Sequence, residues 1–216
     1  MKDEGSKRLS LGVLVSGRGT NLQAILDRCE EGVLSAEVKV VISNRPGVMA
    51  LERASAKGIP CFVIEPRDFG KWPDCKGRYE EKIVQELKSY GVELVVLAGY
   101  DRLVGETLLN AYPMKVINIH PALLPSFPGL NAQKQALEYG VKVSGATVFF
   151  VDLSVDGGPI ILQDACKVMD DDTVESLSQR ILEIEHRILP RAISLIAEDR
   201  LRIEGRKVRI LDPSQK

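Results

Sequence analysis

Histidine and paired cysteine, the residues that most often build metal sites, are scarce in this chain. Of its 216 residues only His120 and His186 are histidines, and its four cysteines are scattered without a C-x-x-C pair. A structural zinc site needs such ligands at short spacing, so we expect no metal. Scattered cysteines also favour reduced thiols over a disulfide framework, which is typical of a cytoplasmic protein.

The sequence also lacks an excess of one charge, a long apolar run and an apolar leader. Lys and Arg number 29 against 30 Asp and Glu, a formal net charge of −1 that gives no global attraction to nucleic acid or anionic membranes. No run approaches the ~20 apolar residues of a membrane span. Residues 1–8 are polar, unlike a signal peptide. Since 44% of residues are hydrophobic and 27% charged, we expect a soluble globular protein.

Short apolar runs alternate with helical patterns through the first half of the chain. Their apolarity is continuous rather than alternating, which is typical of parallel strands covered on both faces. The runs of strand length are 11–15, 38–42, 61–64, 94–97 and 116–118, and the helical patterns are 21–29, 48–56 and 78–90. This rhythm predicts an α/β fold with a Rossmann-like, doubly wound, mostly parallel sheet.

The second half predicts an antiparallel C-terminal extension and a long C-terminal helix. Runs 145–151 and 160–168 flank the turn sequence Asp-Gly-Gly-Pro, and runs 201–203 and 208–210 predict a closing hairpin. Between them, 173–198 is one helical pattern that Pro190 should kink or divide. Its apolar stripe consists of Leu177, Ile181, Ile184 and Ile188. The stripe leaves two packings open, inside one chain or against a second copy in a homodimer.

Two glycines stand in the turn between the first strand and the first helix, within Ser16-Gly17-Arg18-Gly19-Thr20-Asn21. Glycine lets the backbone approach an anion, and the free N–H groups of a helix start attract it. Leu22 stands where a dinucleotide fingerprint needs its third glycine, and no P-loop lysine follows. A tight turn with a helix cap is the alternative, but the position after the first strand favours phosphate binding.

Asn118 and His120 end a candidate strand and share one side of it. Ligands of open α/β sheets bind beyond the carboxyl ends of strands. There His120 would be a proton donor near neutral pH, and Asn118 a donor to an oxyanion. A purely structural histidine is as plausible from these residues alone. A nearby carboxylate would favour the charged imidazole, but the pattern does not choose between Asp152 and Asp156.

Two further features complete the candidate residues. His186 follows Glu185 within the long helical pattern, and we expect it to pair with a carboxylate on a helix face. Tyr100 and Arg102 follow the 94–97 strand, where they would form a cleft wall.

Several of these motifs together resemble a known family. They are SGRGTNLQ at 16–23, LAGYDR at 97–102, NIHPALLP at 118–125, PGL at 128–130 and VDGGPI at 155–160. Over residues 11–210 the chain resembles the phosphoribosylglycinamide formyltransferases, folate-dependent enzymes of purine biosynthesis. The resemblance implies transfer of a formyl group from 10-formyltetrahydrofolate to 5′-phosphoribosylglycinamide, both small molecules.

The resemblance also implies roles for individual residues. The substrate-binding residues would be Gly19, Thr20 and Asn21, which hold the phosphate, and Glu185, which lies near the glycinamide. The catalytic residues would be Asn118, His120 and Asp156, a choice of Asp156 over Asp152. The folate pocket would be lined by Asp101, Arg102, Leu103, Val104 and Asn118, with Lys76 as a looser match. One domain would span 10–211, with a phosphate-binding half at about 10–115, a folate-binding and catalytic half at about 116–211, and tails at 1–9 and 212–216.

The chain departs from the family pattern at three positions. Asp101 stands where Met is usual, and Asn131 and Phe149 stand where His is usual. Asp101 would place a carboxylate beside the cleft, and Phe149 would leave His120 as the sole imidazole. The alternatives are a formyltetrahydrofolate hydrolase, expected to carry an N-terminal regulatory domain, another formyl-folate transferase, such as a methionyl-tRNA formyltransferase with a C-terminal domain, or a non-catalytic folate- or nucleotide-binding protein.

Overall fold

The strands of the computed structural model, which describes residues 8–212, form one nine-stranded sheet in the order β3-β2-β1-β4-β5-β6-β7-β9-β8. Strands β1 to β5 pair in parallel, whereas β6 is antiparallel to β5 and β7. The strands are β1 (Leu9–Val15), β2 (Ala36–Ser43), β3 (Cys61–Val63), β4 (Leu94–Leu97), β5 (Val116–His120), β6 (Val143–Phe150), β7 (Ile160–Lys167), β8 (Leu201–Glu204) and β9 (Lys207–Ile210). The predicted fold class is confirmed.

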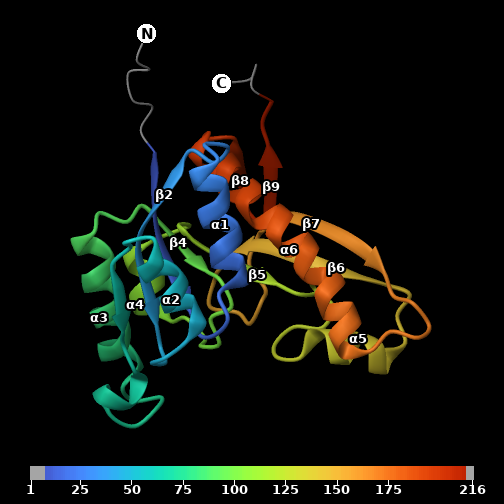
Figure 1. Cartoon of the computed structure of the whole chain (residues 1–216), viewed down its shortest axis with the longest axis horizontal. Helices are drawn as coiled ribbons and strands as arrows, with labels where there is room; N and C mark the ends of the chain where they lie inside the picture. Colours follow the sequence, from blue (N-terminus) through green and yellow to red (C-terminus); the bar gives the residue numbers. More distant parts are fainter. Residues whose placement is uncertain (1–7, 213–216) are drawn as a thin grey trace.

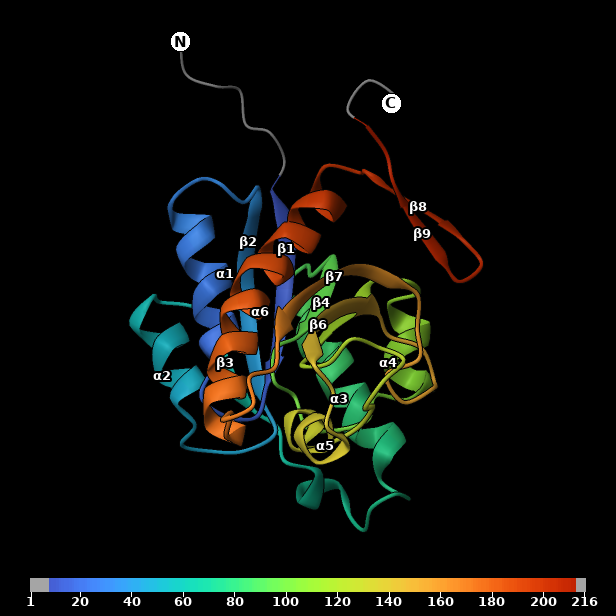
Figure 2. The same ribbon diagram turned by 90° about the vertical axis from the view of Figure 1, so that its right-hand side faces the viewer.

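Helices cover both faces of the parallel half (Figure 1, Figure 2). One face carries α1 (Thr20–Glu30), α2 (Met49–Ala56) and α6 (Val174–Ala197), and the other carries α3 (Lys76–Ser89) and α4 (Glu106–Ala111). Strand β1 alternates between them, since Leu11 and Val13 join the first core and Leu14 joins the second. Gly12 faces α3, where a Cβ would lie 2.3 Å from a Leu87 methyl carbon.

Three short elements have no counterpart in the sequence patterns. They are a 3₁₀ helix at Pro66–Phe69, helix α4, and helix α5 (Ala132–Tyr139). Each has at most eight residues, too few for a clear apolar period. The predicted tails lie mostly outside the described residues, but Leu9 belongs to β1 rather than to a tail.

Helix α6 runs unbroken through Pro190, so the expected division at that residue is wrong. A proline inside a helix leaves one carbonyl, here that of His186, without its usual partner. Burial of apolar surface offsets the loss of this hydrogen bond, since Pro190 and the nearby Leu189 and Ala192 lie in the interior. The stripe from Leu177 to Ile188 is at most 6% exposed and packs within this chain. It is therefore not available to a second copy.

The carboxyl ends of β1, β4 and β5 meet at one edge of the sheet, where the order turns from β1 to β4. Such a switch point opens a crevice for ligands in α/β sheets. The loops after these strands, together with the loops at 121–131 and 151–159, gather at this edge. Across the described part of the chain, no helix is long and apolar enough to cross a membrane.

Candidate active site

The turn between β1 and α1 is built around Gly19. This residue has φ +70° and directly precedes α1. A Cβ there would lie 2.6 Å from the Cβ and 2.7 Å from the Cα of Ala50 on α2. Both constraints require glycine. No side chain caps the start of α1, so the first N–H groups of this helix have no side-chain acceptor within the described residues.

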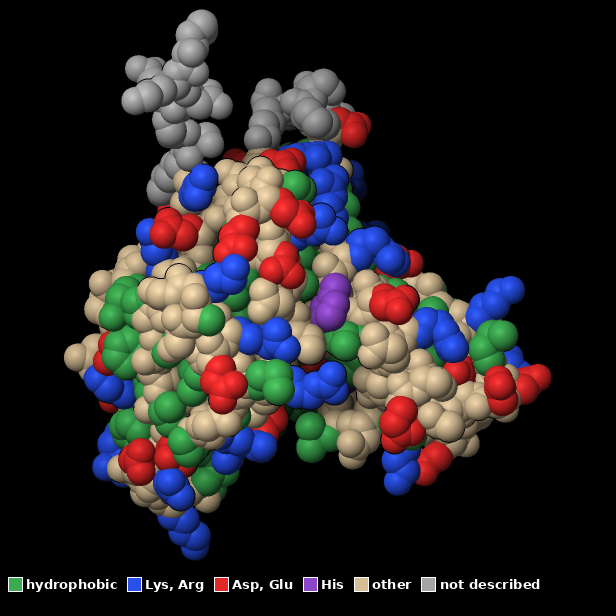
Figure 3. Space-filling model, viewed as in Figure 1, with side chains coloured by type: hydrophobic (Ala, Val, Ile, Leu, Met, Phe, Trp, Pro, Cys, Tyr) green, Lys and Arg blue, Asp and Glu red, His purple; other side chains and the backbone are tan. Residues whose placement is uncertain are grey.

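Asn21 and Glu185 form a buried pair next to this turn. Asn21 Nδ2 donates to Glu185 Oε2 at 2.7 Å, and each residue is 7% exposed. Asn21 Oδ1 has no partner among the described residues. Glu185 also lines a cavity of about 470 Å³ with Arg18, Thr20 and Gln133. On this side the molecule is hollowed between the parts that carry α2 and α5, and charges of both signs are interspersed (Figure 3).

Burial raises the pKa of the Glu185 carboxyl, against a smaller opposing effect of the Asn21 amide. The protonated form is therefore favoured by folding. Its stabilising contribution is complete below the ordinary pKa near 4.5 and is lost as the pH rises through the raised value.

Glu185→Gln is expected to be at least as stable as the wild type at pH 7 and to lose less stability between pH 4.5 and 7.5. The neutral amide still accepts from Asn21 but carries no buried charge. Urea unfolding across this pH range measures the difference. Parallel pH profiles for the two proteins would contradict the proton linkage.

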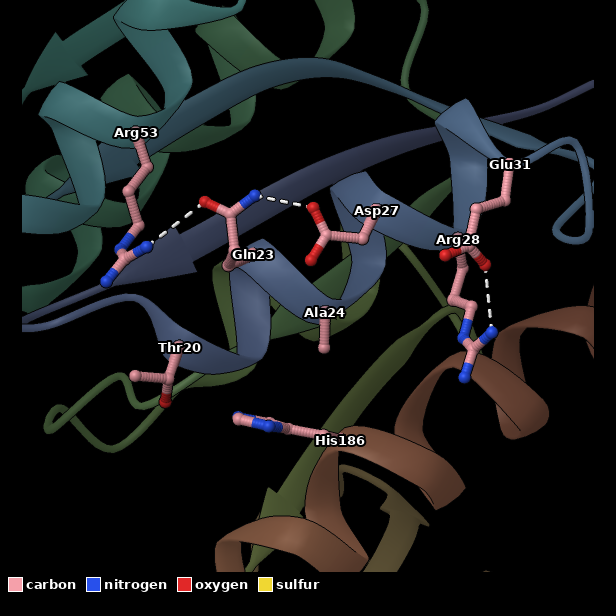
Figure 4. Close-up of a pocket in the computed structure, with 8 residues that line it drawn as sticks. All are labelled: Thr20, Gln23, Ala24, Asp27, Arg28, Glu31, Arg53 and His186. Atoms are coloured by element: carbon pink, nitrogen blue, oxygen red, sulfur yellow. Dashed lines mark hydrogen bonds and ion pairs between the residues drawn. The ribbon is translucent and has the colours of Figure 1, made fainter.

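His186 lines a second cavity of about 330 Å³ together with Thr20 and Gln23 (Figure 4). Its Nε2 atom is buried without a hydrogen-bond partner, and burial lowers its pKa. Within residues 8–212 no ion pair joins it to a carboxylate, so the expected pairing is wrong. Neighbouring residues on a helix point in different directions, and Glu185 is directed at Asn21 instead.

His120 and Asp156 come together at the end of β5. The distance from His120 Nδ1 to Asp156 Oδ2 is 3.5 Å, and His120 is 5% exposed. His120 Nε2 lies 2.8 Å from the carbonyl oxygen of Phe127. A carbonyl only accepts, so Nε2 carries the hydrogen. The orientation of this ring is thus fixed from both sides.

The choice between Asp156 and Asp152 is a matter of loop geometry. Asp156 has φ +50°, and its Oδ2 accepts from the Gly129 N–H at 2.7 Å while facing His120. Asp152 accepts from the Ser154 N–H at 2.8 Å and from its hydroxyl, within its own loop. The structure therefore brings Asp156, and not Asp152, to the histidine.

Asn118 shares a face of β5 with His120, as its register predicts. Its side chain has no hydrogen-bond partner in the described structure, which leaves the amide free for a ligand. Phe149 lies opposite Asn118 on β6 and is 2% exposed. It fills the interior at the position where a second imidazole is usual in the resembled family.

Thr147 is a buried residue of this site that the sequence patterns do not single out. It lies opposite His120, donates to the Ala122 carbonyl at 2.6 Å and accepts from the Leu124 N–H at 3.1 Å. These hydrogen bonds fix the segment that follows β5 in the sequence. The one sequence signal was a hydroxyl inside the apolar run 145–151.

The loop after β4, which holds Asp101 to Val104, is fixed from α3. The buried Glu80 carboxylate accepts from the Gly105 N–H at 2.6 Å and from the Leu108 N–H at 3.2 Å, at the start of α4. Burial raises the pKa of Glu80, partly opposed by these bonds. Val104 is half-buried against the core, whereas Leu103 is 61% exposed.

Two cations flank the single tryptophan beside that loop. Arg102 lies 5.2 Å and Lys76 6.0 Å from the Trp72 ring centre. The Lys76 chain also packs on Gly105, where a Cβ would be 2.6 Å from its Cε. The structure thus brings Lys76 and Arg102 together. Sequence reasoning missed Trp72, although a lone tryptophan next to a basic residue was a usable signal.

Asp101 does not present an unpaired carboxylate to the cleft. It accepts from Ser16 Oγ at 2.9 Å and Asn44 Nδ2 at 2.7 Å, and it forms an ion pair with Arg45. Its own N–H donates to Ser16 Oγ at 3.0 Å. Asp101 therefore ties the ends of β1, β2 and β4 together. Asn131 adopts a left-handed φ of +59° just before α5, a conformation that asparagine tolerates.

Comparison with known proteins agrees with this geometry. Residues 10–193 match the formyl transferase family. The chain belongs to this family. It is 44% identical to the phosphoribosylglycinamide formyltransferase of Bacillus subtilis, over 84% of this chain and 91% of that one. This finding confirms the resemblance drawn from the motifs.

Solved structures of the family give the same fold. The crystal structure of glycinamide ribonucleotide transformylase 1 from Symbiobacterium toebii has a TM-score of 0.91, 53% identity and 96% coverage of both chains. A formyltetrahydrofolate deformylase from Pseudomonas syringae has a TM-score of 0.86 at 28% identity, covering 96% of this chain and 67% of that one. Because both share the fold, the fold alone does not decide the formyl acceptor.

Proposed function

We propose that this formyl transferase moves the formyl group of 10-formyltetrahydrofolate to the amine of 5′-phosphoribosylglycinamide, a step of purine biosynthesis. The products are N-formylglycinamide ribonucleotide and tetrahydrofolate. The observation that carries the proposal is the pairing of His120 with Asp156 at the carboxyl end of β5, on whose face Asn118 also lies. The 44% identity to a phosphoribosylglycinamide formyltransferase supports this acceptor.

The ribonucleotide would bind between the β1–α1 turn and α6. Its phosphate would accept from the turn at Gly19, Thr20 and Asn21, where the α1 dipole adds attraction. The glycinamide would extend toward Glu185, across the cavity that Thr20 and Glu185 line. These assignments rest on the uncapped N–H groups at the start of α1 and on the buried Glu185 carboxylate, which accepts from Asn21.

The folate would lie along the loop of Asp101, Arg102, Leu103 and Val104, and would reach Asn118. A folate ends in carboxylates, which Lys76 and Arg102 complement beside Trp72. Because Asp101 is tied to Ser16 and Arg45, it leaves the pocket without an unpaired charge. Formyl-folate serves as a co-substrate, and the proposed mechanism needs no metal.

In the transfer step the amine nitrogen attacks the formyl carbon. The new C–N bond moves an electron pair onto the formyl oxygen, and the resulting oxyanion accepts from the Asn118 amide and from protonated His120. One proton passes from the amine to N10 of the folate, the C–N10 bond breaks, and tetrahydrofolate leaves. The His120 Nε2–H that donates to Phe127 would exchange this carbonyl for the oxyanion, a stronger acceptor.

We further propose that residues 10–211 act as one cytoplasmic domain. Its phosphate-binding half would be residues 10–115, and its transfer centre would lie in residues 116–211. The two halves share one sheet, so the donor and the acceptor would meet at a common edge.

Asp156→Asn is expected to lower kcat on the order of 10²-fold, because it removes the carboxylate that faces and orients His120 Nδ1 at 3.5 Å. Asp152→Asn is the matched control, since Asp152 bonds within its own loop. Its kcat should equal that of the wild type. Steady-state kinetics on both variants measures the contrast, and equal losses would refute the assignment of Asp156.

A deformylase is the second candidate, because one shares this fold at 28% identity. The two activities differ in the acceptor, an amine or water. Release of tetrahydrofolate, followed by absorbance with and without phosphoribosylglycinamide, separates them. Release only when the ribonucleotide is present is expected. Release at the same rate without it would replace the proposed transferase by a hydrolase.

A further inference from the structure

Two carbonyl groups of the glycine turn point at helix α2. The Gly17 carbonyl accepts from the Ala50 N–H at 3.1 Å. The Arg18 carbonyl accepts from Arg53 Nε at 3.0 Å. Helix α2 also packs directly on Gly19 through Ala50. The turn is thus fixed by α2, an element to which the proposed function gives no role.

Arg53 is itself held by α1. Its Nη1 donates to Gln23 Oε1 at 3.1 Å, and Gln23 Nε2 donates to Asp27 Oδ1 at 2.7 Å. Figure 4 shows Arg53, Gln23 and Asp27 in sequence along one wall of the smaller cavity. One guanidinium therefore spans the turn and the helix that follows it. Gln23 ends the SGRGTNLQ motif, and this contact gives it a role.

The direction of these carbonyls decides what the turn offers to a ligand. In a planar trans peptide the C=O and the following N–H point in opposite directions. With the Gly17 and Arg18 carbonyls bound to α2, the N–H groups of Arg18 and Gly19 point away from α2. An anion site needs this arrangement, because a carbonyl turned toward the phosphate would repel it.

We propose that Arg53 is a positioning residue for the phosphate site. It holds the Arg18 carbonyl on α2, with Gln23 as its second anchor, and acts on the ribonucleotide through the turn. This role rests on the proposed function only in placing the phosphate at the turn. In this role Arg53 sets the geometry of the turn and does not itself form an ion pair with the phosphate.

The test compares Arg53→Ala and Arg53→Lys with Arg28→Ala. Arg28 lines the same cavity, pairs with Glu31 at 2.8 Å and is half exposed, but makes no contact with the turn. Arg53→Ala should raise KM for the ribonucleotide about tenfold, with kcat and KM for the folate unchanged. Arg53→Lys should resemble Arg53→Ala, because an ammonium group cannot reproduce the two directed bonds. Arg28→Ala should leave all three constants unchanged.

Binding of inorganic phosphate, measured by calorimetry on the same proteins, keeps this test separate from catalysis. Arg53→Ala should weaken phosphate binding even if the wild type transfers no formyl group. Wild-type phosphate affinity in Arg53→Lys, or a loss of affinity in Arg28→Ala equal to that in Arg53→Ala, would show that only the positive charge matters. Either result would overturn the proposal. Gln23→Ala, which removes the second anchor, should show a smaller loss in the same direction. If Arg53→Ala fails to fold, an unchanged phosphate affinity in both Arg53→Lys and Gln23→Ala would overturn it.

Discussion

His120→Ala is expected to reduce kcat for formyl transfer on the order of 10²–10³-fold, the usual loss for one oxyanion donor. His120 is buried between Asp156 and the Phe127 carbonyl, and both ring nitrogens are oriented by these partners. Folate affinity should change little, because the ring is proposed to act on the charge that develops during transfer. Steady-state kinetics and a folate binding titration measure both quantities.

His186→Ala is the matched control for this experiment, because it removes the other imidazole of the chain. His186 lies in a separate cavity and makes no ion pair within the described residues. Its kcat should stay near the wild-type value. A His120→Ala protein that is folded and fully active would remove the histidine from the proposed mechanism.

Gly19→Ala is expected to have the second large effect. The new Cβ would meet the Ala50 backbone at 2.7 Å, at a φ of +70° that an L side chain rarely adopts. Left-handed strain alone costs about 1–2 kcal/mol, and the clash forces the turn or α2 to move. We expect ribonucleotide binding to weaken on the order of 10²-fold, with a measurable loss of the free energy of unfolding.

Gly17→Ala separates this effect from a general intolerance of the turn. Nothing lies within 4 Å of a Cβ at Gly17, and its φ is not in the left-handed region. Its urea unfolding curve should match that of the wild type. A Gly19→Ala protein with wild-type stability and ribonucleotide affinity would show that the close approach to α2 is unimportant.

Local patterns in the sequence predicted much of the sheet and the two main motifs. The glycine turn and the Asn118-x-His120 pair were visible because each depends on a few consecutive residues after an apolar run. The Asn118-x-His120 register follows from the alternation of a strand. The long helix was equally clear, but its passage through Pro190 depends on burial by distant elements.

Contacts between distant residues were beyond the sequence patterns. Glu80 meets Gly105 across 25 positions, and Thr147 holds Ala122 across the same separation. The choice of Asp156 depends on a left-handed backbone and on a loop that brings Gly129 to it. The expected pairing of His186 with a carboxylate was wrong because helix direction, not sequence adjacency, decides what a side chain meets.

The central claim is that the formyl group goes to the amine of the ribonucleotide and not to water. The most direct measurement supplies the protein with 10-formyltetrahydrofolate labelled with ¹³C at the formyl carbon and with phosphoribosylglycinamide, and follows the label by NMR. The label is expected to appear as an N-formyl amide in an amount equal to the tetrahydrofolate released. Label found in free formate, with no amide formed, would contradict the account.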